Sequence, residues 1–231
     1  MTLKLYTLCI ADGREPSPFV WRARMALAHK GLTVERVPIG YGEKDRLAFS
    51  AQGLVPVLLD GARWVNDSWA IAQYLEDTHP DRPTLFGGAK GRAVALFVNR
   101  WADVETLGAL RLLLWPATWD HIPVADQAYF RADREKKAGM TLEAMRAEPE
   151  AKIAAFRRAL EPARQTLAQQ PYLCGDRPGY ADYCLFGGFM WGKTISPHRL
   201  LAADDPVHRW RADLLAAFDG MAGADPGYPV D

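Results

Sequence analysis

The stretch from Gly53 to Leu75, GLVPVLLDGARWVNDSWAIAQYL, decides the fold. Its apolar run from Val57 to Leu59 follows a proline and predicts a strand, and a returning strand is expected from Ala62 to Val65. The dipeptide Asp60-Gly61 between them is typical of a type I′ hairpin turn. The stretch therefore predicts a β-hairpin that leads into the polar residues before a helix.

Asp67 and Ser68 open this helix, because both are good N-cap residues and apolar side chains then recur at helical spacing. A helix N-terminus offers free N–H groups and positive potential, which suit a carboxylate. Asp67 adds a negative charge beside it. The pair predicts a site for a ligand that carries a carboxylate and an ammonium on one carbon, the alternative being an ordinary cap.

Pro56 stands directly before the strand, where it cannot donate a ladder hydrogen bond. If the Val55-Pro56 bond is cis, Val55 could present its own N–H and C=O to an extended peptide ligand. The alternative is an ordinary edge strand.

Upstream, alternating residues from Leu3 to Thr7 predict a first strand, and Thr33 to Val37 predicts a second. Residues 17–31 predict a helix, with Ser17 as N-cap, Pro18 at the first helical position and a glycine at the end. A loop or short helix is expected between 40 and 52. The order β-α-β followed by a hairpin predicts a mixed four-stranded sheet.

Strand patterns disappear after a segment rich in proline and glycine, so we expect an α/β domain over residues 1–84, a linker over 85–91 and an all-helical domain over 92–231. Pro116 is expected to stop or kink the first of its helices. The helices expected here span 93–114, 135–145, 150–169, 182–192 and 206–220, and the tail from 222 to 231 reads as irregular.

Composition excludes several classes of protein. The 231 residues carry 28 basic and 28 acidic side chains, so no basic field exists for nucleic acid or an anionic membrane. No apolar run reaches bilayer length, and the N-terminus lacks the pattern of a signal peptide. The three cysteines, Cys9, Cys174 and Cys184, lack metal-ligand spacing, which predicts a reduced cytoplasmic protein without a metal.

Several motifs together resemble the cytosolic glutathione transferases. They are Ser17-Pro18-Phe19, the approach QGLVP at 52–56, Asp67-Ser68, and YLCGD at 172–176 running into Ala181-Asp182. The resemblance implies a thioredoxin-like first domain, a cis Val55-Pro56 bond, glutathione as co-substrate and a homodimer.

By the same resemblance, Val55 and Pro56 hold the cysteinyl backbone of glutathione, Asp67 and Ser68 hold its γ-glutamyl end, and Ser17 faces its sulfur as the catalytic residue. A serine hydroxyl can cap its helix and still donate one hydrogen bond to a thiolate. From the local sequence alone, Ser17 reads equally as a plain N-cap.

Arg14, Lys44 and Arg63 are candidate partners of the glycyl carboxylate. Leu54 stands where many relatives carry a polar residue, so affinity for glutathione could be modest. Gly179 replaces the usual hydroxyl residue before Asp182, to which we assign a folding role with half of a capping box.

A closer resemblance, carried by SPFVWR at 17–22 and WVNDSW at 64–69, is to the bacterial β-etherase group and related fungal transferases. It implies glutathione-dependent cleavage of aryl ethers. A small hydrophobic, aromatic electrophile would bind between the domains against Trp115 and Trp119. His121 is a candidate proton donor to the leaving group.

Two alternatives stay open. A thiol reductase of this fold would need a reactive cysteine, and Cys9 is the candidate, although it reads more readily as a small buried hydrophobe. A non-catalytic binding or scaffold protein would be expected to have a damaged glutathione site.

Overall fold

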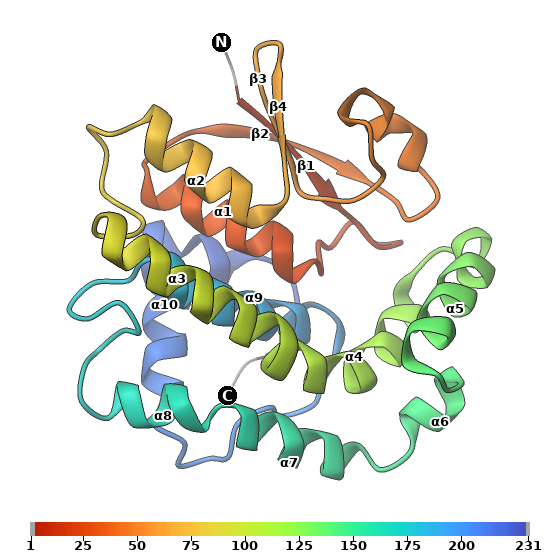
Figure 1. Cartoon of the computed structure of the whole chain (residues 1–231). Coiled ribbons are helices and arrows are strands. Elements are labelled where there is room, and N and C mark those ends of the chain that lie inside the picture. Colours follow the sequence, from red (N-terminus) through yellow and green to blue (C-terminus); the bar gives the residue numbers. More distant parts are fainter. Residues whose placement is uncertain (1–2, 230–231) are drawn as a thin grey trace.

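The computed structural model describes residues 3–229 and contains a small sheet layer beside a larger helical body (Figure 1). The sheet order is β2-β1-β3-β4, formed by β1 (Leu3–Leu8), β2 (Val34–Ile39), β3 (Val57–Asp60) and β4 (Arg63–Asn66). β1 pairs parallel to β2 and antiparallel to β3, and β3 pairs antiparallel to β4. The predicted mixed four-stranded sheet is confirmed.

The hairpin turn differs from the prediction by one residue. Asp60 pairs with Arg63 as part of the ladder, so the two-residue loop is Gly61-Ala62 rather than Asp60-Gly61. Only Gly61 has a positive φ, 59°, whereas a type I′ turn requires positive φ at both loop residues. The type I′ assignment is therefore wrong.

Two capped helices, α1 (Pro18–His29) and α2 (Ser68–Thr78), lie between the sheet and the helical body (Figure 1). Ser17 caps α1, with proline at the first helical position, and Asp67 caps α2. The short helix allowed for between 40 and 52 is the 3₁₀ helix η1 (Lys44–Ser50). Both N-caps were readable from sequence because capping depends on neighbouring residues alone.

The first long helical segment is longer than predicted. It comprises α3 (Ala89–Trp101), the π-helical turn η2 (Ala102–Thr106) and α4 (Leu107–His121). α3 begins inside the segment 85–91 that we expected to be a linker. Pro116 lies within α4 and does not stop it.

Two helices predicted from the sequence, at 135–145 and 150–169, each correspond to parts of two separate helices in the structure. The expected helix 135–145 is wrong: α5 (Val124–Ala138) ends at Gly139, whose φ is +67°, and α6 (Leu142–Arg146) follows. The expected helix 150–169 is divided at Leu160 into α7 (Pro149–Ala159) and α8 (Glu161–Leu167).

Helix α9 (Tyr180–Ile195) is the central element of the helical body, and every one of its residues is buried. It packs on α1, and a Cβ at Gly187 would collide with the Pro18 carbonyl oxygen. Asp182 accepts hydrogen bonds from the Gly179 N–H at 3.0 Å and from the Trp210 indole at 2.8 Å. Asp182 therefore joins α9 to its cap and to the last helix, in the folding role expected for it.

The last helix, α10 (Val207–Ala224), contains a break at residues 217–220, where the backbone is not helical. The predicted irregular tail begins too early, because Ala222 is buried within this element. The Tyr228 N–H donates to the Lys193 carbonyl, which fixes the tail on α9. Residues 230–231 lie outside the described residues. Among residues 3–229, no helix is both long and apolar enough to cross a membrane.

Candidate active site

Ser17 lies where α1 begins, between two prolines, and is only 7% exposed. Its Oγ accepts a hydrogen bond from the Val20 N–H at 3.3 Å, so the hydroxyl caps the helix with a lone pair. Within residues 3–229 its proton has no hydrogen-bond acceptor. The hydroxyl therefore keeps its donor capacity for a ligand, at the positive end of a helix.

The Val55-Pro56 peptide bond is cis, as the resemblance implies. The Gln52 side chain satisfies both backbone groups of Leu54, accepting from its N–H at 2.5 Å and donating to its C=O at 2.8 Å. The N–H and C=O of Val55 make no hydrogen bond within the described chain. This loop thus presents one residue with an unpaired backbone beside Ser17.

Asp67 and Ser68 lie next along this edge, at the start of α2. The Asp67 Oδ1 accepts from the N–H groups of Trp69 and Ala70 at 2.9 and 3.2 Å, and the Asp67 N–H donates to the Pro56 carbonyl at 3.3 Å. Asp67 is exposed and Ser68 is buried. The contact with Pro56 sets the α2 N-terminus beside the loop that carries Val55.

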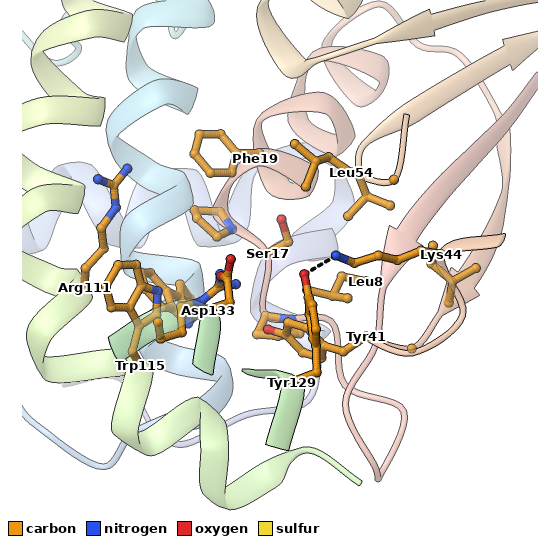
Figure 2. Close-up of a pocket in the computed structure, with 18 of the residues that line it drawn as sticks. Leu8, Ser17, Phe19, Tyr41, Lys44, Leu54, Arg111, Trp115, Tyr129 and Asp133 are labelled. Carbon is orange, nitrogen blue, oxygen red and sulfur yellow. Dashed lines mark hydrogen bonds and ion pairs between the residues drawn. The ribbon is translucent and has the colours of Figure 1, made fainter. Parts of the chain in front are cut away.

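A cavity of about 570 Å³ opens between the sheet layer and the helical body, and Ser17 lies on its wall (Figure 2). Ser17, Val55 and Leu54 contribute to the sheet side, and Trp115 contributes from α4. The residues around this cavity do not include Pro56, Asp67, Ser68 or Trp119. The structure therefore brings Ser17, Val55 and Trp115 together and sets the α2 cap outside the cavity.

Two other residues predicted near the second substrate also lie elsewhere. Trp119 packs under the Arg131 guanidinium, whose carbon is 5.2 Å from the ring centroid. His121 contacts Arg14, with 3.3 Å between the two nitrogens, and the Ile195 carbonyl. Neither residue lines the cavity.

Of the three cations considered for the glycyl carboxylate, only Lys44 lines the cavity. It donates to the Tyr129 hydroxyl, which reaches over from α5 (Figure 2). Arg14 forms an ion pair with Asp12 at 2.7 Å, and the Arg63 guanidinium lies 4.7 Å from the Tyr74 ring centroid. Lys44 is thus the candidate that shares a wall with Ser17 and Val55, and the other two side chains make contacts elsewhere.

Sequence reasoning missed the charged part of this cavity. Four charged side chains from α4 and α5 line it: Arg111, Asp133, Arg134 and Lys137. Asp133 pairs with Arg134 and, at 2.9 Å, with Lys137, whereas Arg111 has no partner within the described chain. Burial lowers the pKa of Arg111, and the nearby cations Arg134 and Arg22 lower it further. Only the packing of α5 against α4 shows that these charges meet.

The thiols are poorly suited to nucleophilic chemistry. Burial raises the pKa of the Cys9 thiol above its usual value, and the nearby Glu43 and Glu15 carboxylates raise it further. Burial within α9 raises the pKa of Cys184 to about 12. Cys9, Cys174 and Cys184 are all free cysteines, and none of them lines the cavity.

Comparison with known proteins identifies the family. A family model described as "Glutathione S-transferase, C-terminal domain" matches residues 93–218, more than half of the chain, and one described as "Glutathione S-transferase, N-terminal domain" matches residues 16–78. The chain belongs to the glutathione S-transferase family. The N-terminal match begins just before Ser17 and includes Val55, Asp67 and Ser68, so the candidate site lies within a glutathione S-transferase domain.

Among curated proteins, the chain is similar to maleylacetoacetate isomerase of Pseudomonas aeruginosa, at 29% identity over 99% of this chain and 98% of that protein. It is also similar to glutathione S-transferase Z2 of Arabidopsis thaliana, at 38% identity over 32% of this chain. The match to that plant protein, like that to its relative Z1, spans only 35% of the relative's length.

Solved structures of fungal glutathione S-transferases share the whole fold. CsGST63524 of Ceriporiopsis subvermispora, solved in complex with glutathione, has a TM-score of 0.82 at 23% identity, covering 98% of this chain and 99% of that one. GSTFuA3 of Phanerochaete chrysosporium has a TM-score of 0.83 at 24% identity, and the match covers 94% of this chain and 97% of that one. At these identities the likeness is one of fold.

Proposed function

We propose that this chain is a glutathione transferase that ionises the thiol of glutathione at Ser17 and directs the thiolate at a small aromatic electrophile. The observation that carries the proposal is the Ser17 hydroxyl: its lone pair caps α1, its proton has no acceptor in the described chain, and it borders the cavity between the two layers. A free thiol titrates near 8.5, so glutathione needs such a donor to ionise at neutral pH.

Glutathione, as co-substrate, would lie along the edge formed by the Val55 loop and the start of α2. The unpaired N–H and C=O of Val55 would pair with the cysteinyl backbone of glutathione, with Pro56 fixing the loop. Asp67 and Ser68, at the helix N-terminus, would take the ammonium and carboxylate of the γ-glutamyl end. Lys44 would pair with the glycyl carboxylate.

The thiolate then attacks an electrophilic carbon of the second substrate. A carbon–sulfur bond forms, the bond to the leaving group breaks, and the leaving group departs with the bonding electron pair. In the β-etherase version the leaving group is a phenolate, which takes a proton from solvent, and a thioether of glutathione remains. The motif at 17–22 and the aromatic side chains Trp115 and Phe19 on the cavity support an aromatic substrate.

The two alternatives are less well supported. A reductase would need Cys9 as a thiolate at the site, but Cys9 lies off the cavity and burial raises its pKa. A scaffold protein would be expected to lack the groups that Ser17, Val55 and Asp67 offer here.

We also propose a homodimer. Val94, Phe97 and Val104 are exposed apolar residues on one face of the segment formed by α3 and η2, at 62%, 73% and 67% exposure. A second copy of the chain would cover this face.

The three free cysteines support a cytoplasmic location. We keep the domain boundaries 1–84, 85–91 and 92–231 as part of the proposal.

The experiment is to record the ultraviolet absorbance of the thiolate of bound glutathione across pH in wild type and Ser17→Ala. We expect the bound thiol to titrate below its free value in wild type, and the variant to raise its pKa and to lower kcat by roughly 10- to 100-fold, the value of one hydrogen bond to a charge.

Thr141→Ala is the matched control, because Thr141 caps α6 through the Ala144 N–H at 3.2 Å. Both variants remove a cap, worth about 1 kcal/mol of stability. Thr141 does not line the cavity, so its loss should leave the titration unchanged. Glutathione that binds but titrates normally in wild type would refute the role of Ser17.

A further inference from the structure

Arg111 is the unexplained charge in the cavity. It extends from α4, is half-buried, and has neither a hydrogen bond nor an ion pair to another group within residues 3–229. A charge that is partly removed from water and has no partner is less well solvated than one on the surface, which favours binding of an anionic ligand. An arginine stays protonated under all ordinary conditions. The guanidinium therefore presents a fixed positive charge, with five N–H donors, to whatever enters the cavity.

Two acids, one that acts on the Arg111 charge and one that lines the same cavity, are already paired with other residues. Asp103 binds Arg22 at 2.7 Å and accepts a hydrogen bond from Asn99 at 2.9 Å. Asp133, which lines the same cavity, is held by both Arg134 and Lys137. Neither carboxylate lies within ion-pair distance of Arg111. Asp103 lies near enough to oppose the lowering of the Arg111 pKa, but no carboxylate within residues 3–229 forms an ion pair with this arginine.

The whole cavity carries an excess of positive charge. Its walls carry one carboxylate, that of Asp133, and four cations: Lys44, Arg111, Arg134 and Lys137. The lining therefore has an excess of three positive charges. Arg134 is paired with Asp133, but its Nε is buried and has no hydrogen-bond acceptor in the part of the chain that the structure describes. The glycyl carboxylate of glutathione at Lys44 and its thiolate at Ser17 would supply two negative charges, which leaves one positive charge uncompensated.

Arg111 and Lys44 belong to opposite sides of the cavity. Lys44 extends from η1 and Arg111 from α4, and Figure 2 draws them on opposite sides of Ser17. The ring of Phe19 and the indole of Trp115 lie on the Arg111 side of the serine in the same view (Figure 2). The aromatic surface and the unpaired guanidinium therefore form one end of the cavity, away from the lysine.

We propose that the electrophilic substrate is an anion, an aromatic or conjugated carboxylate whose carboxyl group binds Arg111 while its flat body lies against Trp115 and Phe19. The electrophilic carbon then faces the sulfur held at Ser17. This assignment rests on the proposed glutathione transferase function and names the substrate class of that site. Arg111 acts in binding and orientation, and the bonds made and broken are those of the thiolate attack described above.

The test compares an anionic electrophile with its neutral isostere. The probes are a chlorodinitrobenzoate, with the chlorine flanked by both nitro groups, and the corresponding benzamide; each gives a thioether and chloride with glutathione. Rates are divided by the uncatalysed rate of each probe, so that their different reactivities cancel. The variants are Arg111→Gln and Arg111→Lys, with Arg158→Gln, an exposed arginine of α7 off the cavity, as matched control.

We expect the wild type to favour the benzoate over the benzamide by about tenfold or more in kcat/KM. Arg111→Gln should raise KM for the benzoate roughly 10- to 100-fold, which is the range for a hydrogen bond to a charge, and should change KM for the benzamide by less than about twofold. Arg111→Lys should restore part of the difference, and Arg158→Gln should match wild type.

A second readout is independent of turnover. Calorimetric binding of dinitrobenzoate and dinitrobenzamide, which lack the chlorine and cannot react, should show the same preference and the same loss in Arg111→Gln. Equal binding of the two in wild type overturns the proposal, as does a variant that raises KM for glutathione instead. If neither chlorinated probe turns over, the transferase function fails, while the unreactive pair still decides the role of Arg111.

Discussion

The Arg22 guanidinium lies 2.7 Å from the Asp103 carboxylate, and this pair joins α1, beneath the sheet, to the π-helical turn η2 of the helical body. Arg22 is fully buried, and its Nε donates to the Cys184 carbonyl of α9 at 3.1 Å. Its guanidinium carbon lies 5.0 Å from the centroid of Phe19, a residue of the cavity wall. One ion pair thus connects both layers to the candidate site.

Removing the acid of this pair should destabilise the protein. Asp103→Asn leaves the buried Arg22 charge without its carboxylate, and we expect the free energy of unfolding to fall by about 3 kcal/mol. Denaturant unfolding monitored by tryptophan fluorescence measures the change. Asp81→Asn, at an exposed acid, is the control and should stay within about 0.5 kcal/mol of wild type. Equal stability of the two variants would contradict this account.

Glu76 should make stability depend on pH in the acid range. Burial opposes its ionisation, but hydrogen bonds from the Leu85 N–H and from Lys30, 2.6 Å away, hold its pKa below the ordinary 4.5. A depressed pKa in the folded state means that the stabilisation is present above about pH 4.5 and is lost as pH falls through the folded pKa.

Glu76→Gln should therefore lower the free energy of unfolding by about 3 kcal/mol at neutral pH, because it leaves the buried Lys30 charge without its carboxylate. The difference in unfolding free energy between variant and wild type, here called the gap, should narrow as pH falls below 4.5. Unfolding curves across pH measure this gap. Glu105→Gln, at an exposed acid, should give a gap near zero throughout. A gap for Glu76→Gln that is independent of pH would show that its carboxylate is not the stabilising group.

The proposed dimer predicts that Phe97→Glu weakens self-association. A charge at the centre of the apolar face formed by Val94, Phe97 and Val104 should cost about 2 kcal/mol or more of association free energy. Sedimentation over a range of protein concentrations measures the shift towards monomer. Val124→Glu introduces the same charge at an 82% exposed residue of α5 and should leave the oligomeric state unchanged. A monomeric wild type would exclude the dimer.

Cys9→Ser should leave transferase activity within about twofold of wild type, because the high pKa of the Cys9 thiol keeps it protonated at neutral pH. The assay follows conjugation of glutathione and, separately, reduction of a mixed disulfide of glutathione. Cys174→Ser is the matched control, since Cys174 also lies off the cavity. Disulfide reduction that disappears in Cys9→Ser alone would favour the reductase.

The parts of the fold that were predictable depend on short-range chemistry. Ser17 and Asp67 cap their helices through side chains that reach two or three residues along the chain, and such contacts are encoded locally. α5 was misjudged because it is largely polar, with Phe130 as its only buried residue, so it shows no clear apolar stripe. Its end at Gly139 was predictable, because a glycine commonly follows the last residue of a helix, but the expected helix 135–145 ran through it.

The charged end of the cavity could not be predicted from sequence. Arg111 stands in a run of leucines that reads as core, and its exposure to the cavity depends on how α5 packs against α4. Trp115 and Trp119 occupy neighbouring turns of α4, yet only Trp115 lines the cavity. Spacing along a helix gives the face on which a residue lies, and tertiary packing decides what that face meets.

The close packing of Gly187 on Pro18 limits how the two halves of this protein can be recombined. Because α9 touches the backbone one residue after Ser17, the first turn of α1 is supported from behind by the other half of the chain. A chimera that joins residues 1–84 to the helical half of a relative with a larger residue at this contact should shift the serine and lose activity while still folding. Exchange of halves between relatives should therefore succeed only when the α9 contact is exchanged along with the serine.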